Sequence, residues 1–552
     1  MKKLLMMIGA AAVAVGAMLP MTAMAANYWW TGKESRSYGD ANNWAVDNAG
    51  SEVATKVPGN DAAYFVGTAF NSRFMGDGYI VEFDRVYTNS WNYYFSTAGA
   101  KVTFRGKTSD CGLTYYRGDY RNIRWRIGEA SDGSLRLENG TFTHAYTNFV
   151  IGVNSTTVAN RRFGHLEIAD GATLNIPSDA GWCDGMLIDN GSVLVDGATL
   201  ASGKDINVGT IATSLSYGSF GAFTNINGTV SANILRVGRK NATAEYIQKG
   251  GNLTTEGDIL IAESYTRGSA YFEVDGGTVT AGGAITNKSI YVGHNGYSES
   301  SAHLVVKGDS EVNCQNLIIG YKAPGIADIE GGIVRCGNEC RLSSTVSSDA
   351  DDALEHPRLN LLGGVLVTSR VKCESTNSYS TVFFNGGTLR ERQDNDTILK
   401  ASDRMDIKVG ANGGTIDMAG FTTTVSEDIE TGVDEGTDGG MKYVGGGTAN
   451  ITGAISYTGP TTVELGTLVK VTDRANIFGE GKGGLRCSLP NPKPEGNEYI
   501  TVLTMTGEDD FTASDLTKCA AAEGAGGISF RISGDGKSIM AKRSNGLIIS
   551  FH

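Results

Sequence analysis

Apolar and polar residues alternate in short segments along most of the chain, and glycine-containing turns separate the segments. The recurring pattern is an alternating run, an Asp-Gly, Asn-Gly or Gly-Gly turn, Thr-Leu or Thr-Val, and a variable stretch that ends in Ile-Gly or Val-Gly. Clear copies lie at 135–142, 193–200, 272–279 and 383–389. Period-two alternation of Val, Ile, Leu and Thr between turn residues is typical of short β-strands. The sequence therefore predicts an all-β protein.

These segments form a repeat of nearly constant length. Eleven turn glycines between Gly140 and Gly414 have a mean spacing of (414 − 140)/10, about 27 residues. One such unit cannot bury its own apolar face, whereas stacked units share one core. We therefore predict a parallel β-helix (a solenoid), right-handed, with about 27 residues and three short strands per coil. An antiparallel β-sandwich is the alternative, because Asn-Gly and Asp-Gly turns also occur in hairpins.

The repeat also predicts the domain organisation. Coils are expected over 131–426, preceded at 26–130 by an N-terminal cap with the first coils. The region 26–130 holds 21 of the 47 aromatic residues, which suits closure of a solenoid end, with a sugar-stacking platform as the alternative. An acidic and glycine-rich loop is expected at 427–446, since residues 427–438 contain six acidic side chains and no basic one. A further repeat is expected at 447–479 and a small β-rich C-terminal cap at 480–552.

The first 25 residues have the layout of a secretory signal peptide. Lys2 and Lys3 precede an apolar run at 4–19, and Ala23-Met24-Ala25 forms a cleavage signal of the small-x-small type. The apolar run is shorter than the roughly 20 residues that a membrane-spanning helix needs, and no later stretch is as long. We therefore expect an exported protein, extracellular or on the outer cell surface, with no transmembrane segment in the mature chain.

Composition and charge exclude several classes of protein. The 552 residues include 75 glycines but only 9 prolines, which excludes a collagen-like chain. Hydrophobic residues make up 40% of the chain, enough for a packed core. The net charge of −13 argues against a nucleic acid or an anionic membrane as partner.

One segment near the C-terminus carries a family likeness. It contains Gly447–Gly453, then Tyr457-Thr458-Gly459-Pro460-Thr461, then Gly466-Thr467-Leu468. Over about 445–471 it resembles the autotransporter-associated β-strand repeat of bacterial surface proteins, whose pattern is Gly-x-Leu-x-Leu-x-Gly, Tyr-x-Gly-x-Thr and Gly-x-Leu. Ala449 stands where the pattern has a leucine. The resemblance implies a passenger-like β-helix displayed outside a bacterial cell, and it implies no catalytic residues.

Eight cysteines in an exported chain are candidates for disulfide bonds. Cys314 and Cys336 occupy the same place in consecutive repeats, so stacking would bring their Cα atoms within the ~4.4–6.8 Å that a disulfide requires. Free buried thiols are the alternative. No zinc site is predicted, because no second Cys/His pair lies at ligand spacing. The predicted disulfides are Cys314–Cys336, Cys340–Cys373 and Cys487–Cys519.

A basic and aromatic segment at 115–127 is the predicted ligand patch. Ile123, Trp125 and Ile127 alternate with two arginines, as expected for a strand that shows its arginines to solvent. In such an acidic chain, this patch is the best candidate for binding an anionic glycan or a cell-surface component. A solvated strand face paired with nearby carboxylates is the alternative. The candidate ligand residues are Arg117, Arg121, Arg124, Trp125 and Arg126.

The sequence shows no singular cluster of carboxylates such as a polysaccharide lyase or glycoside hydrolase needs. Asp170, Asp196 and Asp275 recur just before turn glycines, where Asp favours the hydrogen bonds of turns. We therefore predict no catalytic residue, no cofactor and no metal. The predicted function is that of a non-enzymatic secreted or surface-displayed solenoid, adhesin-like or structural. A polysaccharide lyase or glycoside hydrolase of β-helix fold is the alternative.

Overall fold

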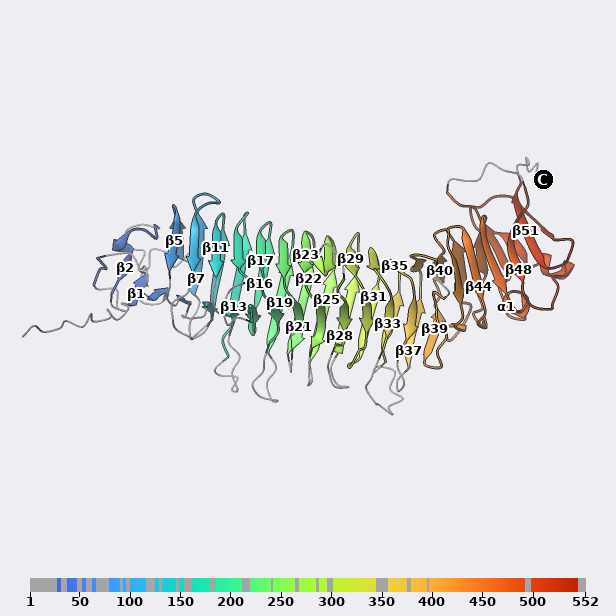
Figure 1. Cartoon of the computed structure of the whole chain (residues 1–552), viewed down its shortest axis with the longest axis horizontal. Coiled ribbons are helices and arrows are strands. Elements are labelled where there is room, and N and C mark those ends of the chain that lie inside the picture. The colour runs from blue at the N-terminus through green and yellow to red at the C-terminus, as the bar shows by residue number, and fades with distance from the viewer. Residues whose placement is uncertain are drawn as a thin grey trace, which may run out of the picture.

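The protein is an elongated rod in which short strands stack side by side from one end to the other (Figure 1). The computed structural model describes residues 27–30, 37–46, 52–55, 62–65, 79–89, 93–95, 100–115, 125–128, 132–144, 148–152, 161–178, 184–210, 219–239, 242–263, 268–283, 287–294, 301–343, 356–374, 379–394, 397–491 and 498–544. The predicted signal peptide at 1–25 lies outside these residues. None of the helices in the described part of the chain has the length and apolar character to cross a membrane.

Three sheets form the sides of the rod, and from residue 62 to residue 391 each coil passes through the first, second and third sheet in that order. Neighbouring strands are parallel, except β1 with β2. The first sheet consists of β2 (Trp44–Ala45), β1 (Asn27–Trp30), β3 (Ala62–Phe65), β6 (Tyr93–Phe95), β9 (Trp125–Ile127), β12 (Phe149–Ile151), β15 (Met186–Ile188), β18 (Ile206–Val208), β21 (Leu235–Arg239), β24 (Ile259–Glu263), β27 (Ile290–Val292), β30 (Leu317–Ile319), β33 (Cys340–Leu342) and β36 (Val371–Cys373).

The second sheet lies along the next side of the rod and the third sheet along the last. The second consists of β4 (Tyr79–Phe83), β7 (Ala100–Gly106), β10 (Gly133–Glu138), β13 (Gly164–Ala169), β16 (Asn190–Asp196), β19 (Phe220–Asn225), β22 (Thr243–Gln248), β25 (Ser269–Val274), β28 (Ser301–Val306), β31 (Gly325–Ile329), β34 (Arg358–Leu361), β37 (Ser380–Phe384), β39 (Met405–Val409) and β42 (Ile429–Thr431). The third consists of β5 (Val86–Asn89), β8 (Gly112–Tyr115), β11 (Thr141–His144), β14 (Thr173–Ile176), β17 (Thr199–Ser202), β20 (Thr229–Ala232), β23 (Asn252–Thr255), β26 (Thr278–Ala281), β29 (Glu311–Cys314), β32 (Ile333–Cys336), β35 (Val365–Thr368), β38 (Thr388–Glu391), β40 (Gly414–Asp417), β43 (Met441–Val444), β45 (Thr461–Glu464), β47 (Leu485–Ser488) and β49 (Cys519–Ala521).

The predicted parallel β-helix is confirmed. Eleven coils separate Leu135 from Ile429 in the second sheet, which gives (429 − 135)/11, about 27 residues per coil. The residues of this row point inward and are buried, because every second strand residue faces the interior. Within the row, the rings of Phe223, Tyr246 and Phe272 stack with centroids 5.1 Å and 4.7 Å apart. Neighbouring coils thus share one continuous core.

Glycine is needed where the chain turns from the first sheet into the second. Gly152 adopts a φ of 72°, and a Cβ there would lie 1.7 Å from the carbonyl oxygen of Asn190 in the next coil. Gly209 and Gly293 repeat the same left-handed conformation. Ala262 stands at the equivalent position of another coil and also takes a positive φ, 58°. The turn geometry, rather than the residue type, is therefore what repeats.

Aromatic side chains fill the N-terminal end of the core. Trp30 packs edge-on against Trp44 with ring centroids 5.1 Å apart, and Tyr38 contacts both Trp44 and Phe83. The rings of Trp30, Tyr38 and Trp44 are at most 2% exposed. These aromatic residues therefore close the end of the rod, as a cap requires.

At the C-terminal end, a fourth sheet continues the side formed by the first. It consists of β41 (Thr422–Val425), β44 (Gly447–Ile451), β46 (Thr467–Val471), β48 (Ile500–Met505), β51 (Ser538–Arg543) and β50 (Ile528–Ile532). The last pairings, β48 with β51 and β51 with β50, are antiparallel. The short helices are η1 (Ala41–Asn43), α1 (Ala475–Phe478) and α2 (Ala513–Leu516).

The segment 427–446 differs from the expected loop. It contributes β42 to the second sheet and β43 to the third, so the solenoid continues through it. Two of its six acidic side chains are almost fully buried, Glu427 at 9% and Asp438 at 3% exposure. Charge density alone favoured a solvated excursion, but hydrogen bonds to the neighbouring coils hold these carboxylates inside.

Candidate functional site

The predicted basic patch lies only partly within the described residues. Arg117, Arg121 and Arg124 are outside them. Trp125 and Arg126 belong to β9, where Trp125 is in register with Phe149 and Arg126 with the next residue. The outward direction of the arginines and ligand binding at this patch both stay predictions.

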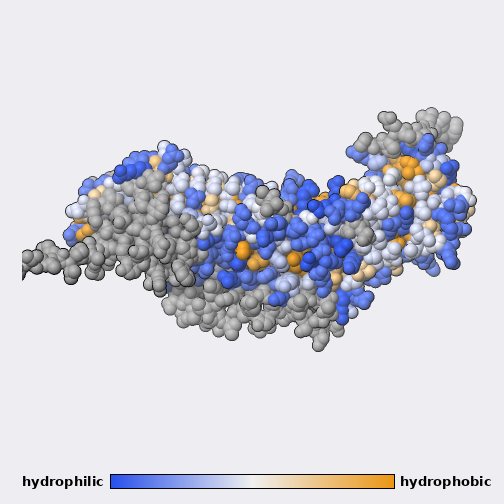
Figure 2. Space-filling model, viewed as in Figure 1, coloured by the Kyte–Doolittle hydropathy of each residue, from blue (hydrophilic) through white to orange (hydrophobic). Residues whose placement is uncertain are grey.

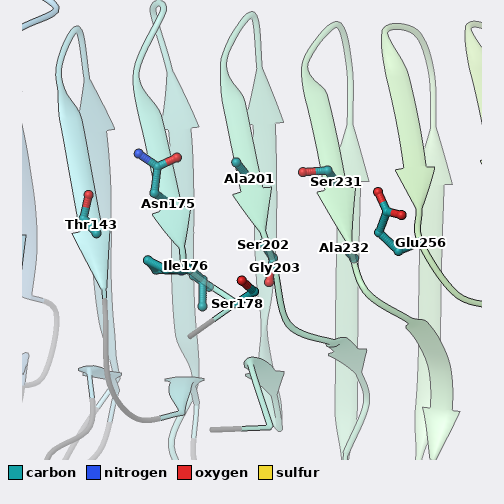
Figure 3. A pocket seen from close by; sticks show the side chains of 11 residues that line it. Thr143, Asn175, Ile176, Ser178, Ala201, Ser202, Gly203, Ser231, Ala232 and Glu256 are labelled. Carbon is teal, nitrogen blue, oxygen red and sulfur yellow. The ribbon is translucent and has the colours of Figure 1, made fainter. Parts of the chain in front are cut away.

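An open groove lies on the outside of the third sheet, at the ends of β11 to β23 (Figure 3). It has a volume of about 510 Å³, within the range typical of small-molecule sites. Figure 3 shows Thr143, Asn175, Ala201 and Ser231 at corresponding places on four neighbouring strands. Glu256 stands at one end of the groove. The lining residues are Thr143, Asn175, Ile176, Pro177, Ser178, Ala201, Ser202, Gly203, Ser231, Ala232 and Glu256.

The groove continues into an uncharged, hydroxyl-rich face. Six neighbouring strands of the third sheet, β11, β14, β17, β20, β23 and β26, form two rows of outward residues that are in register from strand to strand. Every residue in these two rows is Thr, Ser, Asn or Ala. Their hydroxyl and amide groups both donate and accept hydrogen bonds, and the threonines add methyl groups. On β29 the row becomes charged at Glu311. The rows are Thr141, Thr173, Thr199, Thr229, Asn252 and Thr278, and Thr143, Asn175, Ala201, Ser231, Thr254 and Thr280.

Sequence reasoning missed this face. The signal was present, since Thr-Leu or Thr-Val after the turn glycine was part of the repeat. That pattern identified strands, but only the strand register shows that the threonines of successive coils fall into one row. The groove contains a single carboxylate, that of Glu256. It can therefore bind polar groups, but it lacks the two carboxyl groups that glycoside hydrolysis requires.

A second, smaller hollow of about 370 Å³ is acidic. One of its lining residues is Glu427, whose Oε2 accepts a hydrogen bond from the backbone N–H of Ser402 at 2.6 Å. Burial raises the pKa of Glu427 to about 7, and the negative charges of Asp428 and Asp406 act in the same direction. A carboxyl group with a raised pKa beside other carboxyl groups is the kind of arrangement that acid–base catalysis uses. The acidic lining residues are Asp403, Asp406, Glu427, Asp428 and Glu430.

Asp438 has a structural role in the same region. Its Oδ1 accepts hydrogen bonds from the backbone N–H groups of Gly440 and Gly459, both at 2.9 Å. Its Oδ2 accepts from the Thr458 backbone N–H at 2.7 Å and from the Thr458 hydroxyl at 3.0 Å. Burial would raise the pKa of Asp438, but these hydrogen bonds hold it below its ordinary value. The carboxylate thus joins two consecutive coils.

Two predicted cysteine partners are neighbours. Cys314 on β29 and Cys336 on β32 are in register, and their Sγ atoms are 4.0 Å apart. Both are buried and are free thiols in this structure. The contact with Cys336 and burial both raise the pKa of the Cys314 thiol. The predicted disulfide stays a prediction, and its partners are correctly placed.

The other predicted cysteine pairs are out of register. Cys340 is in register with the residue two positions before Cys373. Cys519 is likewise in register with the residue two positions before Cys487. This offset separates Cα atoms by roughly 8 Å in adjacent parallel strands, beyond the ~6.8 Å limit of ordinary disulfides. Without a movement of the backbone, neither pair can form a disulfide.

Charged residues on the second sheet pair across coils near the N-terminal end. Arg105 Nε lies 2.7 Å from Glu138 Oε2, and Arg136 contacts Glu138, Glu167 and Asp170. Burial would raise the pKa of Glu138, but hydrogen bonds from Arg136 and Arg105 lower it. These side chains form ion pairs between neighbouring coils, so we do not propose them as ligand-binding residues. In the described residues, no group of three or more His, Cys, Asp or Glu is arranged to hold a metal ion.

Comparison with known proteins adds no relative to this description. No model of a protein family matches the chain. No curated protein and no solved structure matches it. Function must therefore be argued from the fold and the surface of this chain.

Proposed function

We propose that the protein is a non-enzymatic solenoid that is exported and acts outside the cell as an adhesin-like or structural surface component. The observation that carries this proposal is the repetition of the third-sheet face, in which six coils present the same uncharged hydroxyl and amide groups in register. A catalytic site needs a singular set of groups, whereas a repeated row offers many equivalent contacts to an extended partner.

The likeness of 445–471 to the autotransporter-associated repeat supports the same proposal. Tyr457 and Thr461, the first and last residues of its Tyr-x-Gly-x-Thr motif, have their hydroxyl oxygens 2.6 Å apart, and both side chains are buried. Gly459 at the centre donates its N–H to Asp438, and a Cβ there would lie 2.3 Å from the Gly440 nitrogen. These three motif residues thus have structural tasks at a coil corner, and their contacts require no catalytic role.

The alternative, a glycoside hydrolase or polysaccharide lyase, is favoured by one observation. Glu427, with its raised pKa, lies in the acidic hollow with Asp406 and Asp428. In a hydrolase, Glu427 would serve as the general acid and an ionised neighbour as the base or nucleophile.

Incubation of the purified protein with pectin, alginate, mucin and glycosaminoglycans separates the two functions. Retention on a polysaccharide without soluble product is the expected result. Release of product that Glu427→Gln abolishes would establish the hydrolase instead. The matched control is Asp434→Asn, an exposed acid of the same segment outside the hollow, which should leave the release unchanged. Fractionation of the producing cells tests export, and a product found only in the cytoplasm would contradict the proposal.

A further inference from the structure

Exposed aromatic side chains gather along one edge of the rod. Among the described residues, seven large hydrophobic side chains are exposed. Four of them are aromatic, namely Phe163, Phe220, Tyr321 and Tyr379, and they are between 37% and 49% exposed. All four lie where the chain passes from the first sheet to the second, just before or at the start of β13, β19, β31 and β37. A single exposed aromatic residue is ordinary, but four that recur at one corner of the coil are a candidate for a recognition surface.

The strand register places three of the four aromatic residues at equivalent positions in their coils. Phe220 pairs with Asn190, and Phe163 precedes Gly164, which pairs with the residue after Asn190. The two phenylalanines therefore hold equivalent positions two coils apart, or roughly 10 Å at ~4.8 Å per coil. Tyr379 holds the same position six coils beyond Phe220. From Phe163 to Tyr379 the edge is eight coils, or roughly 38 Å, long.

Two of the rings are accompanied by cations. Lys322 Nζ lies 5.5 Å from the ring centroid of Tyr321, and the guanidinium carbon of Arg404 lies 5.2 Å from that of Tyr379. Within the described part of the chain, neither cation forms an ion pair with a carboxylate. Tyr321 also stacks on His294 with ring centroids 5.7 Å apart, which fixes its orientation. These platforms combine a flat apolar surface with an uncompensated positive charge.

Between the aromatic platforms the edge is polar. The residues that pair with Phe220 in the following coils are Thr243, Ser269 and Ser301, and all three are exposed. On the face visible in Figure 2, hydrophobic colour in the middle of the rod forms separate spots instead of one band. A protein partner or a membrane would favour a continuous apolar patch, whereas spaced rings with hydroxyl groups between them suit a chain of separate rings.

We infer that this edge binds a linear anionic polysaccharide, with its chain parallel to the rod axis. Pyranose rings have an apolar C–H face that packs on aromatic rings, and their hydroxyl groups hydrogen-bond to the Thr and Ser side chains between the platforms. The carboxylates of uronic acid units pair with Lys322 and Arg404. One pyranose unit is about as long as one coil is high, so a chain with one sugar on Phe220 has another on Phe163, two units away, and a third on Tyr379, six units away in the other direction. The inference rests on the proposed extracellular function, where such polysaccharides occur.

Binding of a polygalacturonate oligomer, measured by calorimetry with its methyl ester as the neutral counterpart, tests the inference. We expect the acid to bind more tightly than the ester, and the binding to weaken as salt is added. Phe220→Ala and Tyr379→Ala should each weaken binding of the acid roughly tenfold. Ile500→Ala, which truncates a side chain of similar exposure (39%) in the C-terminal cap, should leave it unchanged.

Arg404→Gln together with Lys322→Gln should remove the preference for the acid over the ester. The inference is overturned if neither oligomer binds, if both bind equally to the unaltered protein, or if Phe220→Ala and Tyr379→Ala bind as the unaltered protein does. Circular dichroism of each variant shows whether the fold is intact. The same samples are assayed for shortened product. Formation of shortened product would overturn the non-enzymatic function but not the binding of polysaccharide at this edge. Absence of both binding and product would overturn the binding edge but not the non-enzymatic function.

Discussion

Replacing Asp438 by alanine tests whether a buried carboxylate joins the coils in the acidic segment. The side chain is 3% exposed and accepts hydrogen bonds from three backbone N–H groups, of Gly440, Thr458 and Gly459. Alanine removes all of these acceptors and leaves the three donors without a partner. Asp438→Asn keeps the shape and one acceptor oxygen, so its effect should lie between those of alanine and the unaltered protein.

The expected cost follows from the number of donors. A buried donor without a partner costs about 1–3 kcal/mol, so three donors set a range of roughly 3–9 kcal/mol. Partial rearrangement and entry of water reduce this cost, and we expect about 4 kcal/mol for Asp438→Ala. Each 1.4 kcal/mol corresponds to a factor of ten, so local opening of this corner should become roughly a thousandfold more frequent.

Native-state hydrogen exchange with mass spectrometry measures this opening on peptides that cover 438–461. The amides of Gly440, Thr458 and Gly459 should lose their protection in Asp438→Ala, while peptides from the N-terminal coils exchange as before. Asp434→Ala is the matched control, since Asp434 is an exposed acid of the same segment. An exchange rate within about threefold of the unaltered protein would refute the assignment of Asp438 as the joint between these coils.

Three further predictions concern other parts of the rod. Because burial raises the pKa of Glu427 to about 7, the folded protein binds the proton of this carboxyl group more tightly than the unfolded chain does. The resulting contribution to the free energy of unfolding is complete below about pH 4.5 and is lost as the pH rises through 7. Glu427→Gln should abolish this decline, at most about 3 kcal/mol, in denaturant titrations at about pH 5 and about pH 8. Mild oxidation should link Cys314 to Cys336, stabilising the protein by about 3 kcal/mol, and peptide mapping that finds both thiols free would contradict it. Gly152→Ala should lower the thermal midpoint far more than Gly197→Ala, because both glycines have positive φ but only at Gly152 would the new Cβ overlap a neighbouring coil.

The fold was predictable because it repeats. Each coil reuses one alternation of apolar and polar residues, so weak local signals add up over many coils. The predicted coil of about 27 residues agrees with the mean spacing of paired residues. Individual coils vary, however, from 22 residues between Ile407 and Ile429 to 32 between Phe272 and Leu304.

That variation limits what the sequence can say about contacts. Cys314 and Cys336 were placed correctly because both follow the same Val-x-Cys pattern after a turn. Cys340 and Cys373 lie in coils of unequal length, and a register error of one or two residues is enough to move one thiol out of reach of the other. The groove and the aromatic edge depend on the same register, so neither could be assembled from the sequence.

Burial of charge was the least predictable feature. Asp434 and Asp438 are four residues apart in one acidic run, yet the first is exposed and the second is 3% exposed. The difference arises from Thr458 and Gly459, one coil further along the chain, whose N–H groups point at Asp438. Local composition counts charges without their partners, and a buried carboxylate is stable only where such partners exist.

In a solenoid, a residue whose type differs from that of the other residues in its row therefore says more about binding surfaces than a residue of the same type as its neighbours. The outward row on the third sheet is uncharged from Thr141 to Thr278 and then becomes charged at Glu311. The row at the start of the second sheet is polar at Thr243 and aromatic at Phe220. Packing of the core does not require either change, because both rows face outward. If the proposed function holds, changes on outward rows mark where the rod meets a partner, and the hydroxyl-rich face and the aromatic edge would be two such places on different sides of it.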